Sequence, residues 1–142
     1  MKIRELLKQR SGKVFRVNAS DSIEEAAKRM SSHGIGSLMV EDATGNITGI
    51  ISERDIVLGI AKNGASLQAN SVADLMSRDL IRCDPDSSVN EAMGLMTDRR
   101  IRHLPVFDNE QLIGLVSIGD LVKYRIMEVQ AESEALRAYI AS

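Results

Sequence analysis

The sequence predicts an α/β (α+β) protein made of two copies of one β-α-β-β-α unit, and two observations lead to this prediction. The first is a pair of matching segments, 49–55 (GIISERD) and 114–120 (GLVSIGD), which share the pattern Gly-x-x-Ser-x-x-Asp. The second is the agreement of other residues when the two halves are aligned. Self-similarity at a fixed spacing indicates an internal repeat. We therefore divide the chain into a first repeat, residues 1–64, and a second repeat, residues 65–142.

The alignment matches both apolar and polar positions. At a shift of 66 the matched pairs are Arg16 with Arg82, Ile23 with Val89, Glu25 with Glu91, Ala26 with Ala92, Met30 with Met96, Ile35 with Ile101, Leu38 with Leu104 and Val40 with Val106. The apolar matches would recur in any duplicated core. Among the polar matches, we expect the arginines and glutamates either to pair with each other or to lie on a solvated face.

The first repeat begins with a short lead-in helix over residues 1–10, where three aliphatic residues recur at helical spacing. A short strand at 14–17 follows. The next helix starts with Ser20 or Ser22 as its cap and stops at 33–34, because serine favours helix starts and glycine favours helix ends.

A hairpin comes next. Residues 37–40 and 47–51 are the predicted strands, and the polar, glycine-containing segment 42–46 has the composition of the loop between them. The serine and aspartate at the end of the second strand then lead into a helix over 55–61, which ends at 63–64.

The second repeat follows a small, polar connector at 65–71 and its own short lead-in helix at 72–76. Its last helix is longer than its counterpart and runs from Ile118 to about Ile140. A narrow apolar seam follows this helix, broken by Ser133, with the members Val122, Ile126, Val129, Leu136 and Ile140. We expect the seam to be partly a partner surface, with packing on its own repeat as the competing explanation.

Composition limits the classes of function. A chain of 142 residues with 44% hydrophobic and 27% charged residues can bury a substantial core. The net charge of -2 and the scarcity of aromatic residues disfavour non-specific nucleic-acid binding. No apolar run approaches the roughly 18 residues of a membrane span, and the N-terminal segment is too charged for a signal peptide. We therefore expect a cytoplasmic protein.

Two other motifs carry little weight for function. Cys83 is the only cysteine, which excludes an internal disulfide or a thiolate metal cluster and suggests a small buried residue. Gly34 and Gly36 resemble the start of a dinucleotide fingerprint, but Met39 replaces the third glycine and the segment enters a strand. We reject that interpretation.

The paired serine and aspartate of the Gly-x-x-Ser-x-x-Asp segments have two interpretations. Ser-x-x-Asp before an apolar run resembles a capping box, which satisfies N–H groups at a helix start. For either copy alone this is the better interpretation. Two copies at matched places also suit a ligand site, because a helix start gathers N–H donors that bind anions, and a carboxylate beside them suits a ribose.

Taken together, the repeats resemble tandem cystathionine β-synthase (CBS) domains, known as a Bateman module. The resemblance covers nearly the whole chain, and its most telling residues are 89–92, 102–106 and the two Gly-x-x-Ser-x-x-Asp segments. It implies two pseudo-symmetric repeats packed as one compact module, with clefts that hold AMP, ADP, ATP, NAD or S-adenosylmethionine.

The resemblance also implies roles for individual residues. The nucleotide-binding candidates are Ile35, Gly36, Ser37, Ser52, Arg54, Asp55, Arg100, Ile101, Arg102, His103, Ser117 and Asp120. The aspartates would hold ribose hydroxyls, and Ser52 or Ser117 would lie near phosphate or ribose. Each aspartate would face the opposite repeat, so that Asp55 meets residues 101–103 and Asp120 meets residues 35–37. The arginines would then favour the Asp55 cleft for phosphates.

The function implied by the resemblance is a non-catalytic regulatory module without a catalytic cofactor or a metal. Nothing in the sequence is attached to the repeats, so we expect it to act on a separate protein or through its own oligomer. Related modules usually form homodimers. One alternative is a nucleotide-using enzyme, although the sequence has no P-loop, zinc helix or nucleophile elbow. The other is a structural or DNA-associated adaptor that uses the basic run at 99–103.

Overall fold

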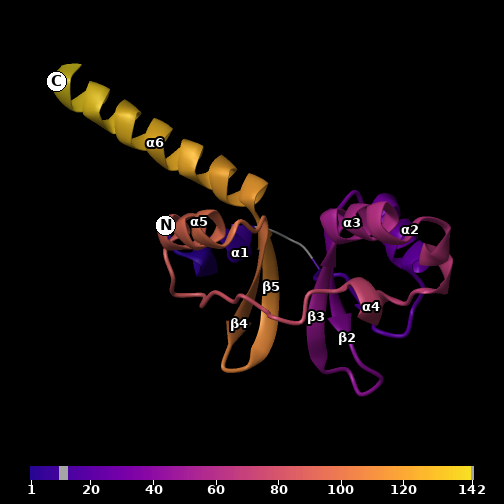
Figure 1. The fold of residues 1–142 in the computed structure, drawn as a ribbon. Helices are drawn as coiled ribbons and strands as arrows, with labels where there is room; N and C mark the ends of the chain where they lie inside the picture. The colour runs from indigo at the N-terminus through magenta and orange to yellow at the C-terminus, as the bar shows by residue number, and fades with distance from the viewer. Residues whose placement is uncertain (10–12, 142) are drawn as a thin grey trace. The chain divides into compact units, whose positions relative to one another are not determined.

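The computed structural model describes residues 1–9 and 13–141. The chain forms two compact units, which are described separately. The first unit is Val14–Leu80, and the second unit combines Met1–Lys13 with Ile81–Ser142 (Figure 1). Both contain helices and strands, as the predicted α/β (α+β) class requires. No helix in the described residues is long and apolar enough to cross a membrane.

The first unit holds a small three-stranded sheet with helices beside it. Its elements are β1 (Arg16–Asn18), α2 (Ile23–His33), β2 (Ser37–Glu41), β3 (Ile47–Ser52), α3 (Glu53–Asn63), the short 3-10 helix η1 (Gly64–Ala69) and α4 (Val72–Leu75). Strand β2 is central, parallel to β1 and antiparallel to β3. The core of the unit consists of Val17, Ile23, Ala26, Met30, Leu38, Val40, Ile51, Val72 and Met76. The predicted order of strand, helix, hairpin and helix is confirmed for this repeat.

The second unit repeats this plan with one change. Its elements are α1 (Ile3–Gln9), α5 (Val89–Arg99), β4 (His103–Asp108), β5 (Gln111–Ser117) and α6 (Ile118–Ala141). The strands β4 and β5 are antiparallel. The strand expected before α5 is reduced to a single parallel bridge between Cys83 and Val106. Pro85 explains the change, because proline lacks the N–H that would continue the ladder.

Cys83 is a buried thiol, as its position in the sequence suggested. Its exposed fraction is 6%, and it packs in the core of the second unit. Burial, together with the charge of Asp84, raises the pKa of the Cys83 thiol to about 11. The thiolate is the reactive form of cysteine, so burial and protonation both disfavour reaction of Cys83 at neutral pH.

The lead-in helices pack in an unexpected way. Helix α1 precedes the first repeat in sequence, yet Ile3 and Leu6 are fully buried in the core of the second unit. Helix α4 precedes the second repeat, yet Val72 belongs to the core of the first unit. The packing units therefore differ from the sequence repeats 1–64 and 65–142, because each unit takes its lead-in helix from the other repeat's sequence.

The glycines of the two Gly-x-x-Ser-x-x-Asp segments make this packing possible. A Cβ on Gly49 would lie 2.6 Å from the backbone oxygen of Ser77, the residue that follows the α4 segment. A Cβ on Gly114 would lie 2.7 Å from a side-chain carbon of Leu7 on α1. Contacts this short do not occur around real Cβ atoms, so each glycine provides the space in which the lead-in segment docks.

Candidate functional site

The serine and aspartate pairs at residues 52–55 and 117–120 form reciprocal helix caps. Asp55 Oδ2 accepts hydrogen bonds from the Ser52 backbone N–H at 2.8 Å and from Ser52 Oγ at 3.0 Å, while the Asp55 N–H donates to Ser52 Oγ. In the second unit, Asp120 Oδ2 accepts from the Ser117 N–H at 3.0 Å, and the Asp120 N–H donates to Ser117 Oγ at 3.1 Å. The capping interpretation is therefore confirmed at both helix starts.

The same capping device occurs at other helix starts of the chain. Ser22 and Ser88 accept from the N–H groups of Glu25 and Glu91, and Ser71 forms a full capping box with Asp74 at α4. The hydrogen bond from the Ser71 backbone is the main cause that lowers the pKa of the Asp74 carboxyl. Ser-x-x-acid is thus a local capping pattern here, and it identifies no ligand site without its surroundings.

Most of the backbone N–H groups at the two helix starts, which the sequence suggested could bind an anion, already donate hydrogen bonds within the protein. The first N–H of α3, from Glu53, donates to the Gly36 oxygen at 3.0 Å, and the third, from Asp55, donates to Ser52. In α6 the first N–H, from Ile118, donates to the Arg102 oxygen at 2.8 Å. Any anion at these helix starts therefore depends mainly on neighbouring side chains.

The pairing of the two hairpin strands brings further predicted nucleotide-binding residues next to each Ser-x-x-Asp cap. In the first unit, Ser37 pairs with Ser52 across the β2 and β3 ladder, and Gly36 is bonded to Glu53, so Gly36, Ser37, Ser52 and Asp55 lie together. Ile35 reaches the same place, because its N–H donates to the last turn of α2 at Met30. Ser37 is only 3% exposed, so its hydroxyl is part of the interior.

The second unit has the same backbone arrangement with different side chains. His103 pairs with Ser117, and Arg102 is bonded to Ile118, so Arg102, His103, Ser117 and Asp120 lie together. The Ile101 N–H donates to Met96 at the end of α5, as that of Ile35 does at the end of α2. The backbone pairing therefore places the basic residues Arg102 and His103 near Asp120.

This grouping differs from the crossed grouping expected from the family resemblance. Within each unit, the structure gathers the predicted residues around the aspartate of their own repeat, so Arg102 and His103 lie with Asp120. Arg54 is the residue directly before Asp55 on α3. The pairing of Asp55 with residues 101–103 stays a prediction.

A shallow depression of about 250 Å³ lies beside Asp55 in the first unit. Its lining residues are Asp55, Leu58, Gly59, Lys62, Asn63, Asp74 and Leu75, which come from α3 and α4. Its volume is below the roughly 300–1,000 Å³ of usual ligand pockets, so it accommodates a fragment such as a sugar. Sequence reasoning missed it, because α4 was assigned to the other repeat; the signal was the helical spacing of residues 55, 58, 59 and 62.

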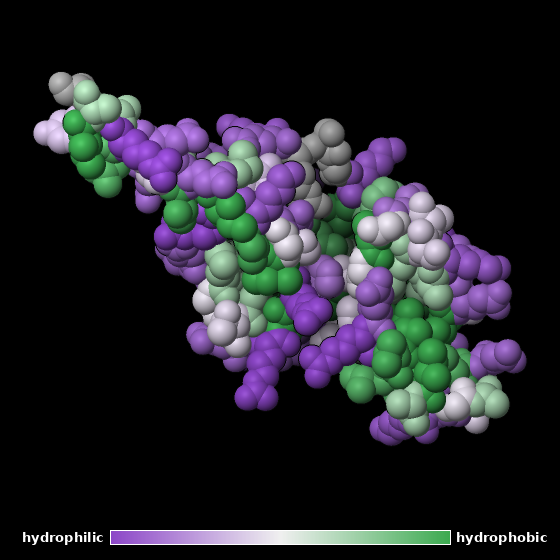
Figure 2. All heavy atoms as spheres, turned by 90° about the horizontal axis from the view of Figure 1, so that it is seen from above, coloured by the Kyte–Doolittle hydropathy of each residue, from purple (hydrophilic) through white to green (hydrophobic). Residues whose placement is uncertain are grey.

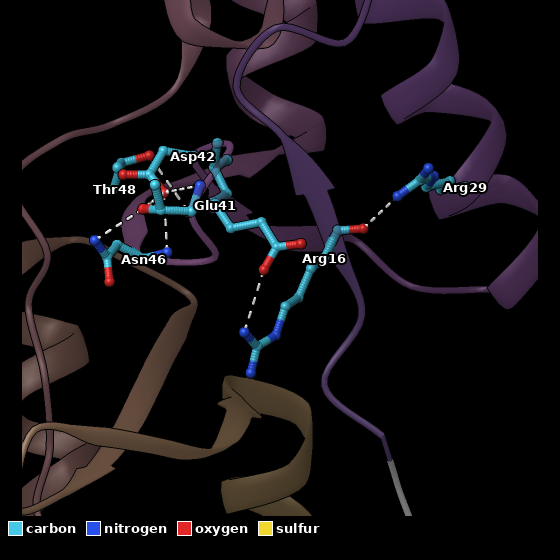
Figure 3. A network of polar contacts seen from close by, with 8 residues as sticks. Arg16, Arg29, Glu41, Asp42, Asn46 and Thr48 are labelled. Atoms are coloured by element: carbon cyan, nitrogen blue, oxygen red, sulfur yellow. Dashed lines mark hydrogen bonds and ion pairs between the residues drawn. The ribbon is translucent and has the colours of Figure 1, made fainter.

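The other matched polar residues make structural contacts. Arg16 forms an ion pair with Glu41, and Arg29 donates to the Arg16 oxygen (Figure 3). Arg29 also pairs with Glu25 one turn earlier on α2. Of the two alternatives for these residues, Arg16 does not pair with Glu25, because Arg16 has its partner on the neighbouring strand β2 and Glu25 has its partner on its own helix. Arg82 pairs with Glu110 and lies over the Phe107 ring.

No group of three or more histidine, cysteine, aspartate or glutamate side chains in residues 1–9 and 13–141 is arranged to hold a metal ion. What the two helix starts offer instead is a carboxylate whose Oδ2 accepts from the capping serine and, in the second unit, the exposed Arg102 and the half-buried His103 nearby. A ribose diol fits the carboxylate, and phosphate oxygens fit arginine and histidine.

Arg100 occupies a backbone position that favours glycine. It caps the C-terminus of α5 in the left-handed region at φ 54°, where Gly34 caps α2 at φ 63°. A left-handed conformation costs a non-glycine residue about 1 kcal/mol. Replacement of Arg100 by glycine should therefore raise the free energy of unfolding by about 0.5–1 kcal/mol, measured by urea denaturation. Gly34→Ala is the matched control and should lower it; equal effects at both positions would contradict the argument.

Comparison with known proteins gives a consistent family. A family model described as CBS domain matches residues 3–62 and 72–126. The Arabidopsis thaliana protein named CBS domain-containing protein CBSX3, mitochondrial, is 40% identical over 124 residues, which cover 84% of this chain and 60% of that protein. The chain thus spans about three fifths of that relative's length.

Solved structures that resemble this chain also contain CBS domains. The CBS-domain containing protein ATU1752 from Agrobacterium tumefaciens has a TM-score of 0.85 at 40% identity, over 87% of this chain and 92% of that one. The CBS domain pair of protein MJ0100, solved in complex with 5-methylthioadenosine and S-adenosyl-L-methionine, has a TM-score of 0.79 at 26% identity, over 90% of this chain and 98% of that one. This chain belongs to the CBS domain family and carries two CBS repeats.

Proposed function

We propose that this chain is a non-catalytic regulatory module that binds an adenosine-containing nucleotide and signals to a partner protein. The observation that carries the proposal is the gathering of Arg102 and His103 with the capped carboxylate of Asp120. The adenosine ligands named for the related MJ0100 pair support the same class of ligand.

The carboxylate and the cations have separate roles in this proposal. Asp120 is held by the Ser117 N–H, so its position is fixed before a ligand arrives, which lowers the entropic cost of binding a ribose diol. Arg102 is exposed and His103 is half-buried, so both reach solvent, where a phosphate would enter. Asp55 also accepts from the N–H of its capping serine, and Gly36 and Ser37 occupy the strand positions that Arg102 and His103 occupy beside Asp120, although Lys62 lines the depression beside Asp55. We therefore infer a nucleotide phosphate at Asp120 and an uncharged nucleoside part at Asp55.

The proposal also covers the partner protein, the oligomeric state and the cellular location. Ligand binding that favours one conformation of the chain would change the surface that a partner meets. A homodimer and a cytoplasmic location are part of this proposal and rest on the sequence and its family, although the plant relative is named as mitochondrial.

The experiment that tests this function is a ligand panel on the wild-type protein. Native mass spectrometry of freshly purified protein should show bound ligand, and calorimetry with AMP, ADP, ATP, NAD and S-adenosylmethionine should give saturable binding with at least one of them. AMP should bind at least about tenfold more tightly than adenosine, because a hydrogen bond to a charged group contributes about 1.5–3 kcal/mol. Absence of binding by the whole panel would refute the proposal, and turnover of a nucleotide would favour an enzyme.

A further inference from the structure

The C-terminal part of α6 carries an apolar seam that its own unit leaves exposed. Near the start of the helix, Leu121 and Tyr124 are buried in the core of the second unit. Every described residue from 130 to 141 is exposed. The exposed fractions of the seam are 52% for Ile126, 46% for Val129, 60% for Leu136 and 74% for Ile140. Figure 1 shows this end of α6 extending beyond α5, and Figure 2 shows apolar side chains at its tip.

The seam has the spacing of a two-stranded coiled coil. In a heptad frame, positions a are Ile126, Ser133 and Ile140, and positions d are Val122, Val129 and Leu136. Isoleucine at two a positions and leucine at one d position suit two parallel strands, whereas the valines at the other two d positions carry no such preference; a single polar residue at an a position fixes register at a cost in stability. Ser133, which interrupts the seam, is therefore consistent with pairing in one register.

The charges beside the seam distinguish a parallel pair from an antiparallel one. Glu132 lies at position g and Arg137 at position e of the next heptad. In a parallel pair a g residue faces the e residue five positions later on the partner, so Glu132 meets Arg137 of the second copy on both sides of the seam. In an antiparallel pair that overlaps the whole seam, Ser133 would face Val129, Glu132 would meet Glu132, and Lys123 would meet Arg137. Among pairs that bury the whole seam from Val122 to Ile140, opposite charges are therefore matched in the parallel arrangement and not in the antiparallel one.

We propose that residues 122–141 of α6 pair with the same segment of a second copy of this chain as a parallel two-stranded coiled coil. A second copy is the occupant of the seam, because Glu132 of each copy would lie opposite Arg137 of the other. A segment of this length is marginal as an isolated helix in water, so burial of the seam stabilises both the helix and the pair. The inference is independent of nucleotide binding.

Cysteine cross-linking of the full chain tests the arrangement. Ser133→Cys and Ile140→Cys place thiols at two a positions, and Ala131→Cys places one at the outer f position as the matched control. Cys83 is buried and does not interfere. In oxidised glutathione, both a-position variants should form disulfide-linked dimers, and the Ala131→Cys variant should not. In an antiparallel pair, a residue can lie next to its own copy at only one place along the seam. Cross-linking of only one of the two a-position variants would therefore overturn the proposal, and so would cross-linking of the Ala131→Cys control to the same extent.

Charge exchange tests the match across the seam without any change in the seam itself. Glu132→Lys should weaken dimerisation about threefold to tenfold in analytical ultracentrifugation, because two attractive pairs become repulsive. The double variant Glu132→Lys with Arg137→Glu should restore the wild-type dissociation constant. Circular dichroism of each variant checks that α6 stays helical. A wild-type protein that stays monomeric at high concentration, or a double variant no tighter than the single one, would contradict a parallel coiled coil.

Discussion

Asp120→Ala should weaken AMP binding at least about tenfold and more than Asp55→Ala does. Each carboxylate accepts from the backbone N–H of its capping serine, so both substitutions remove this hydrogen bond, and Asp55→Ala also removes the one from Ser52 Oγ. They differ in their neighbours, because Arg102 and His103 lie with Asp120, whereas Gly36 and Ser37 lie with Asp55. Hydrogen bonds to a charged ligand group contribute about 1.5–3 kcal/mol each, which corresponds to tenfold or more in affinity. Isothermal titration calorimetry with AMP measures the difference.

Two further variants separate ribose binding from helix capping. Asp120→Asn keeps an oxygen that can accept from the Ser117 N–H, so it should preserve the cap while it removes the charge. Asp74→Ala removes the equivalent capping box at α4 and measures the effect of losing a cap, about 0.5–2 kcal/mol in stability. If Asp55→Ala costs more AMP affinity than Asp120→Ala, the crossed grouping of residues 101–103 with Asp55 would be favoured instead.

Arg102 provides a control that concerns only the phosphate. Its backbone oxygen accepts from Ile118 whatever its side chain is, so Arg102→Ala should leave the start of α6 intact. The substitution should reduce the affinity for AMP and leave that for adenosine nearly unchanged. Equal losses for both ligands would place the guanidinium away from the phosphate.

Part of this arrangement could be read from the sequence. The duplicated Gly-x-x-Ser-x-x-Asp segment predicted both the repeat and the helix starts, because strand, turn and cap are all determined by residues close in the chain. The hairpin pairing that brings Ser37 to Ser52 and His103 to Ser117 follows from the same local pattern. Those features needed no knowledge of distant contacts.

Other features depend on packing that the sequence pattern does not specify. Helices α1 and α4 each have a few apolar residues that suit either repeat, so only the shape of the receiving surface decides where they dock. The loss of a regular strand around Cys83 depends on one proline. The left-handed backbone of Arg100 was also unexpected, because the matching residue in the first repeat is a glycine and arginine rarely adopts this conformation.

Gly49→Ala should be among the most destabilising small substitutions in the first unit, with a loss of about 2–3 kcal/mol in the free energy of unfolding. The added Cβ would meet the Ser77 backbone oxygen at 2.6 Å. That backbone cannot move away freely, because the Ser77 N–H donates to the Ile50 oxygen at 2.8 Å and the Ile50 N–H donates to the Ser77 oxygen at 3.0 Å. Relief of the clash would therefore break the bridge that holds the segment after α4 to β3.

Two alanine substitutions serve as controls for Gly49→Ala. Gly114 meets the Leu7 side chain, which can rotate, so Gly114→Ala should cost only about 1 kcal/mol. Gly94 lies inside α5 with open space around it, so Gly94→Ala should stabilise the protein by about 0.5–1 kcal/mol through helix propensity. Urea denaturation of the three variants should rank them Gly94→Ala, Gly114→Ala and Gly49→Ala in decreasing stability. If Gly49→Ala were as stable as Gly114→Ala, the β3 backbone would have to tolerate displacement, and the docking of the α4 segment would not require glycine.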